Sequence, residues 1–67
     1  MPTIELNGET RHIASDTNVA MLLAAAGYAD RRVAIEINRE IVPKSSHHER
    51  LLHDGDRVEI VHALGGG

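Results

Sequence analysis

The chain has 67 residues, 42% of them apolar, with no cysteine and a formal net charge of −3. This size allows one domain with a thin core and no deep ligand pocket. The composition excludes a disulfide scaffold, and the absence of a basic patch argues against nucleic-acid binding. The first residues do not match a signal-peptide pattern, so we expect none, and the longest uncharged run, which ends before Asp30, falls short of the ~20 apolar residues of a membrane span. We therefore expect a cytoplasmic protein whose partners are proteins.

The first residues predict a β-hairpin. Residues 3–6 alternate polar and apolar side chains, which places Ile4 and Leu6 on the buried face of a strand. Asn7-Gly8 follows, and this pair favours a type I′ turn because both central positions need a positive φ. Residues 9–14 are then the returning strand.

The next stretch predicts a helix. Residues 15–18 (SDTN) are all of helix-capping types, and Gly27 suits the end of the helix. One helical stripe is apolar and consists of Val19, Leu22, Leu23 and Ala26. The opposite side carries Ala20 and Ala24, so the helix is apolar all round. This indicates either a good helix former in a small domain or a face covered by a partner or second copy.

The remaining elements are three strands and one helical turn. We expect strands at 33–37 and 40–42, joined by a tight turn at 38–39 and stopped by Pro43, a helical turn near Ser45 or Ser46, and a last strand at 57–63 that buries Val58 and Ile60. Leu51 and Leu52 should anchor the helical segment, and residues 54–56 (DGD) form a turn. The order predicts an α+β fold in which one main helix packs on a mixed sheet of about five strands, with the first and last strands parallel at its centre.

No constellation of side chains predicts catalysis or metal binding. The five histidines are His12, His47, His48, His53 and His62, and none lies at the spacing of a zinc site. Asp54 and Asp56 flank a turn glycine, without a third oxygen ligand close in sequence. We expect no bound metal or cofactor and no enzymatic activity of the chain itself.

The last residues carry the functional hypothesis. Gly65, Gly66 and Gly67 follow the last strand, and an extended stretch from Leu64 would reach roughly 13 Å beyond the domain. Such a thin tail can deliver a carboxylate into a narrow active site. The alternative is a frayed end or a cloning remnant. Val61 and Ala63 point away from the buried side of the last strand, and with Leu64 they form a small apolar patch that could dock a partner.

Two stretches resemble a known family. Residues 37–43 (INREIVP) and 54–67 (DGDRVEIVHALGGG), in a chain of this length, look like the ThiS family of sulfur carriers of thiamine biosynthesis. The resemblance covers the whole chain. It implies a β-grasp, ubiquitin-like domain at residues 1–64 and a flexible tail at 65–67.

The resemblance also implies a mechanism. A ubiquitin-activating-type adenylyltransferase would use ATP to convert the Gly67 carboxylate to an acyl-adenylate. Sulfur drawn from cysteine, through a donor such as a cysteine desulfurase, would then give a thiocarboxylate on Gly67, the sulfur source for thiazole synthase. Gly65, Gly66 and Gly67 would enter the partners' active sites.

Three other functions are compatible with the sequence. The small subunit of molybdopterin synthase shares the implied fold, tail and thiocarboxylate but serves a different acceptor. A ubiquitin-like modifier would end in an isopeptide bond from Gly67 to lysine. A β-grasp regulatory or RNA-binding module would use no chemistry at its terminus.

Overall fold

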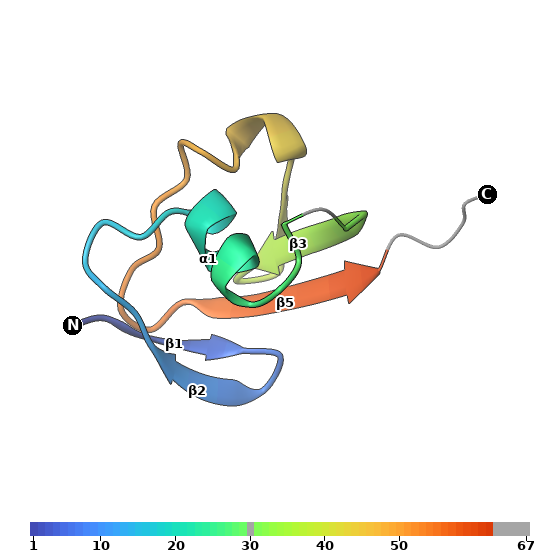
Figure 1. Ribbon diagram of the computed structural model, residues 1–67. Helices are drawn as coiled ribbons and strands as arrows, with labels where there is room; N and C mark the ends of the chain where they lie inside the picture. The colour runs from blue at the N-terminus through green and yellow to red at the C-terminus, as the bar shows by residue number, and fades with distance from the viewer. Residues whose placement is uncertain (30, 63–67) are drawn as a thin grey trace.

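A five-stranded mixed sheet carries the fold, and α1 lies across one of its faces (Figure 1). The computed structural model describes residues 1–29 and 31–62, the last of these by its backbone alone. In chain order the elements are β1 (Thr3–Leu6), β2 (Glu9–His12), α1 (Val19–Ala25), β3 (Val33–Ile37), β4 (Glu40–Val42), the 3-10 turn η1 (Lys44–Ser46) and β5 (Arg57–His62). The strand order β2-β1-β5-β3-β4 places the last strand at the centre, parallel to the first. Both features of the predicted α+β sheet are confirmed.

The N-terminal hairpin forms as predicted up to its return strand. Asn7 and Gly8 have φ values of 49° and 87°, as a type I′ turn requires. β2 then ends at His12, two residues before the predicted end at 14. The chain leaves the sheet at Ile13, whose N–H donates to the Pro2 carbonyl at 3.0 Å and whose side chain is buried. The predicted strand is therefore too long by the two residues that follow His12.

The helix is capped at both ends by its own flanking residues. Asn18 is the N-cap, and its side-chain oxygen accepts from the Met21 N–H at 2.8 Å. At the other end Gly27 has a φ of 90°, and the N–H groups of Gly27 and Tyr28 donate to the carbonyls of Ala24 and Leu23. This is the Schellman arrangement, which satisfies the last carbonyls of a helix. Within the described ranges no helix has the length and apolar composition needed to cross a membrane.

The core lies between α1 and the sheet. Its buried apolar side chains are Ile4, Leu6, Ile13, Val19, Leu22, Leu23, Ile35, Ile37, Val42, Leu52, Val58 and Ile60. The predicted burial of Val58 and Ile60 is confirmed. The expectation that both leucines of the 51–52 pair anchor their segment is half wrong, because Leu52 is 3% exposed but Leu51 is 42% exposed. In this segment, which belongs to no helix or strand, one leucine turns inward and its neighbour turns outward.

Candidate functional site

Most of the predicted site lies outside the described residues. This applies to Ala63, Leu64 and the glycines at 65–67. Val61 is the predicted docking residue that the structure describes, and it is 46% exposed. The described part of the site is therefore the end of β5, which residue 63 follows in the chain.

β5 is hydrogen-bonded to a neighbouring strand on each side. It pairs antiparallel with β3 over five residue pairs, the last being Val33 with His62. On its other side the parallel pairing with β1 reaches the Leu6–Val58 pair. The side-chain oxygen of Asn7 then accepts from the Ile60 N–H at 2.8 Å, which extends the contact by one step. Pairing on both sides makes β5 a firm base for whatever follows it.

The start of β5 is locked by a second set of hydrogen bonds. Asn38, in the turn between β3 and β4, forms two hydrogen bonds with the backbone of Arg57. The Asn38 N–H donates to the Arg57 carbonyl at 2.8 Å, and the Asn38 side-chain oxygen accepts from the Arg57 N–H at 3.0 Å. The Asn38 Nδ2 also donates to Asp56 Oδ1 at 3.0 Å. Asp56 Oδ2 in turn accepts from the His53 N–H at 2.8 Å. The two stretches that carried the family resemblance therefore meet at this lock, and both set the register of β5.

The two faces of β5 differ in chemistry. Val58 and Ile60 face α1 and are buried. Arg57, Glu59 and Val61 alternate with them and lie on the uncovered face of the sheet, as predicted for Val61. On this face Arg57 forms an ion pair with Glu5 of β1 at 3.4 Å.

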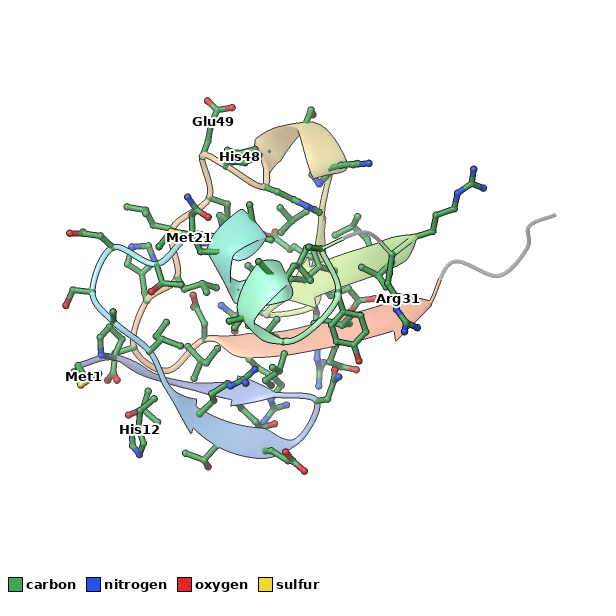
Figure 2. All side chains as sticks on the ribbon, viewed as in Figure 1. Met1, His12, Met21, Arg31, His48 and Glu49 are labelled. Carbon is green, nitrogen blue, oxygen red and sulfur yellow. The ribbon has the colours of Figure 1, made fainter. Side chains whose placement is uncertain are left out.

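A hollow of about 490 Å³ lies on the α1 side of the sheet, near the C-terminal end of β5. Arg31, Arg32 and Lys44 line it, and no carboxylate of the described residues is among its lining groups. Figure 2 shows Arg31 beside the end of β5, which agrees with the backbone pairing of Val33 and His62. Cations therefore lie near the end of β5 on the α1 side, whereas the uncovered face of β5 carries Glu59 and Val61 toward this end.

The histidines and turn carboxylates occupy separate places in the fold. His12 lies on β2, where a ring nitrogen is 3.0 Å from Thr3 Oγ1, and the buried His47 contacts the Val42 carbonyl through Nε2 at 3.2 Å. Asp54 accepts from the Thr3 N–H at 2.8 Å, and Gly55 has the positive φ of a tight turn. The predicted turn at 54–56 is confirmed. Within the part of the chain that the structure describes, no three such side chains are grouped to hold a metal ion.

Sequence reasoning missed three residues that position β5. The sequence predicts Asn7 and Asn38 as turn residues alone, and Asp56 as a turn carboxylate. Each also bonds to β5 or its flank across a long stretch of chain, as in the Asn7–Ile60 contact. The signal in the sequence was the choice of asparagine at both tight turns, because its side chain can accept a further hydrogen bond.

Comparisons with known proteins agree on one family. The family model described as "ThiS family" matches residues 4–67. The chain is 40% identical to the sulfur carrier protein ThiS of Bacillus subtilis, with 96% of this chain and 98% of that protein covered. The crystal structure of the thiamine biosynthesis protein ThiS from Geobacter metallireducens superposes with a TM-score of 0.84 at 31% identity and covers 97% of this chain and 99% of that one. The predicted β-grasp fold is therefore confirmed.

Similar segments also occur in longer proteins. The chain is 47% identical over 92% of its length to part of the thiazole synthase of Paramagnetospirillum magneticum, and 36% identical over 96% of its length to part of that of Magnetococcus marinus. It spans about a fifth of the length of each, at 19% and 20%.

Proposed function

The chain belongs to the ThiS family, and from this premise we propose that it is the sulfur carrier for the thiazole moiety of thiamine. The observation that carries the proposal is the family match over residues 4–67, which includes the final glycines. The central, doubly paired position of β5 supports it, because a carrier must present its tail from a rigid base. In this proposal residues 1–64 are the domain and residues 65–67 are the tail.

The proposed chemistry takes place at the Gly67 carboxylate. A carboxylate resists nucleophilic attack, so an adenylyltransferase of the ubiquitin-activating type would first join it to AMP from ATP and release pyrophosphate. A persulfide sulfur, supplied indirectly by a cysteine desulfurase, attacks the acyl carbon and displaces AMP. A thiol then cleaves the resulting acyl disulfide, which leaves the thiocarboxylate on Gly67 and a disulfide on the donor side. The chain contributes no acid or base of its own to these steps, and its role is to place a thin terminus in another protein's active site.

Thiazole synthase is the proposed acceptor of the sulfur. Segments similar to this chain form part of two proteins of that name, which supports a direct partnership between carrier and synthase. After the transfer the carrier regains its carboxylate. We place the cycle in the cytoplasm, where ATP for activation is at hand.

The docking surface of this proposal is the apolar patch Val61, Ala63 and Leu64. The exposure of Val61 on the uncovered face of the sheet supports it, because this side chain contributes little to the core and is free to contact a partner.

Adding one alanine after Gly67 tests the role of the terminus. The extended protein should fold normally and should fail to support growth without thiamine of a strain that lacks its own carrier. The same residue added before Met1 is the matched control and should support growth. The intact mass of the purified extended protein shows that the added residue is still present. Growth equal to that of wild type with the residue in place would contradict the proposal.

A further inference from the structure

The turn between β1 and β2 leaves one backbone nitrogen open to reaction. Asn7 and Gly8 are both exposed, and Gly8 has a φ of 87°. A Cβ atom at Gly8 would meet nothing within 4 Å, so the space around this residue is open. Among the described residues, no group accepts a hydrogen bond from the Gly8 N–H. The Gly8 nitrogen is therefore unshielded, and glycine lets the turn change shape at little steric cost.

The side-chain amide of Asn7 is polarised at its oxygen and unheld at its nitrogen. Its Oδ1 accepts from the Ile60 N–H at 2.8 Å. No group in the described part of the chain accepts a hydrogen bond from its Nδ2. A donor aimed at a carbonyl oxygen stabilises the negative charge that develops there when a nucleophile attacks the carbon. Asn7 Cγ is thus prepared for attack by a nucleophile, and the amide nitrogen can leave.

Asn38 provides a matched comparison within the same chain. It is also exposed, has a φ of 52° in a tight turn, and accepts from a β5 N–H, that of Arg57, at 3.0 Å. Two features differ from Asn7. The next residue is Arg39 rather than glycine, and the Asn38 Nδ2 donates to Asp56 Oδ1 at 3.0 Å. The leaving nitrogen is therefore held at Asn38 and unheld at Asn7.

The third asparagine of the sequence, Asn18, is held at both positions. Its Nδ2 donates to the His48 carbonyl at 3.3 Å. The N–H of the next residue, Val19, donates to the Arg50 carbonyl at 3.0 Å and is not available as a nucleophile. Of the three asparagines, Asn7 alone is followed by an unshielded nitrogen and has an unheld amide.

We infer that Asn7 is a site of spontaneous deamidation, and that the isoaspartyl product of this reaction detaches the β1–β2 turn from β5. The Gly8 nitrogen gives its proton to a solvent base and forms a bond to Asn7 Cγ, while the Ile60 N–H stabilises the oxyanion on Oδ1. The bond from Cγ to Nδ2 then breaks, and Nδ2 takes a proton from water and leaves as ammonia. The product is a five-membered succinimide. The inference stands apart from the proposed function, because it needs no partner protein.

Water opens the succinimide in two ways. Attack at Cγ restores the normal backbone and leaves an aspartate at position 7. Attack at the backbone carbonyl carbon leaves the chain connected through Cγ, which is the isoaspartyl form. Overall, one water is consumed and one ammonia is released, with no oxidant or reductant.

The two products differ in what they do to the fold. Asn7 makes two hydrogen bonds with β5, because its N–H donates to the Val58 carbonyl at 2.9 Å and its Oδ1 accepts from the Ile60 N–H. Aspartate can keep both bonds. The isoaspartyl form adds one carbon to the backbone of a two-residue turn whose type I′ geometry matches the twist of its strands. It therefore cannot keep the turn and the bond to Ile60 together.

The test follows all three asparagines in the folded protein. The purified chain is incubated at mildly alkaline pH in heavy-oxygen water, and peptide mass mapping with chromatography separates aspartyl from isoaspartyl products. We expect Asn7 to react at least tenfold faster than Asn38, equivalent to a barrier lower by about 1.4 kcal/mol. Each product molecule should carry one heavy oxygen at position 7, which marks the opening of a succinimide by water.

Two variants separate the effects of sequence and structure. Arg39→Gly places glycine after Asn38, and the φ of 72° at position 39 accepts glycine without strain. Because Asp56 still holds the amide nitrogen, Asn38 should remain slower than Asn7 in this variant. Asn7→Asp is the control for the second product and should unfold close to wild type. The isolated isoaspartyl form should have a Tm about 5–15 °C lower, because it loses hydrogen bonds to β5.

Three results would overturn the inference. Deamidation of Asn7 no faster than that of Asn38, or only after urea has unfolded the chain, would refute the reaction site. Equal rates at Asn7 and Asn38 in the Arg39→Gly variant would refute the role of the unheld amide. An isoaspartyl form with the same Tm as Asn7→Asp would refute the detachment from β5.

Discussion

Replacing Asp56 with alanine should weaken the fold more than its position in a short turn suggests. The residue is 7% exposed, and its carboxylate accepts from the His53 N–H and from Asn38 Nδ2, while its ion pair with Arg50 is long at 4.0 Å. A hydrogen bond contributes about 1 kcal/mol, and a donor left without a partner in a partly buried site costs about 1–3 kcal/mol. We therefore expect Asp56→Ala to lower the free energy of unfolding by about 2–3 kcal/mol.

This loss is large for a domain of this size. At about 0.05–0.15 kcal/mol per residue, the whole chain is stable by roughly 3–10 kcal/mol. Each kcal/mol shifts the Tm of such a domain by about 4–8 °C, so the Tm should fall by about 10–20 °C. Thermal unfolding followed by circular dichroism measures the change.

Asp54→Ala is the matched control for this experiment. Asp54 lies two residues away, is exposed and accepts one hydrogen bond, from the Thr3 N–H at 2.8 Å. Its replacement should cost about 1 kcal/mol or less. If Asp56→Ala lowered the Tm no more than Asp54→Ala, the lock at the start of β5 would not contribute as the structure indicates.

Two further substitutions test the core and the docking surface. Leu52→Ala should lower the free energy of unfolding by about 2–5 kcal/mol in denaturant unfolding, because Leu52 is 3% exposed. Leu51→Ala should lower it by less than about 1 kcal/mol, because Leu51 is 42% exposed. Equal costs would contradict the assignment of Leu52 alone to the core. Val61→Asp should cost no more than about 1 kcal/mol of stability but should weaken binding to the activating enzyme or thiazole synthase, and unchanged affinity for both in titration calorimetry would remove Val61 from the docking surface.

Local patterns predicted most of the elements because each leaves its own signal in a short stretch of sequence. The glycine of Asn7-Gly8 marks a turn with positive φ, Asn18 caps a helix, and alternation marks β3 and β5. The central place of β5 followed from the order of the elements. The same reasoning did not predict that β2 would end at His12, because Ile13 is buried outside the sheet and so mimics a strand residue.

The features that the sequence could not show depend on register and on long-range contacts. Alternation placed Val61 on the outer face of its strand, but it could not set Glu59 opposite Glu36 without knowledge of how β5 pairs with β3. The Asn7–Ile60 hydrogen bond likewise joins residues 53 positions apart. In the 51–52 segment no periodicity tells which leucine turns inward. Residues 63–67 are not among the described residues, so their predicted roles stay predictions.

The role of Gly67 as the sulfur-carrying terminus can be measured as the intact mass of the chain after reaction with ATP, the activating enzyme of the same organism and a sulfur source. We expect a mass gain equal to the exchange of one oxygen for one sulfur, located on the C-terminal peptide, dependent on ATP and absent from the protein extended beyond Gly67. An unchanged mass at the C-terminus, while the enzyme consumes ATP in the presence of the chain, would show that Gly67 is activated for another purpose and would contradict the role of sulfur carrier.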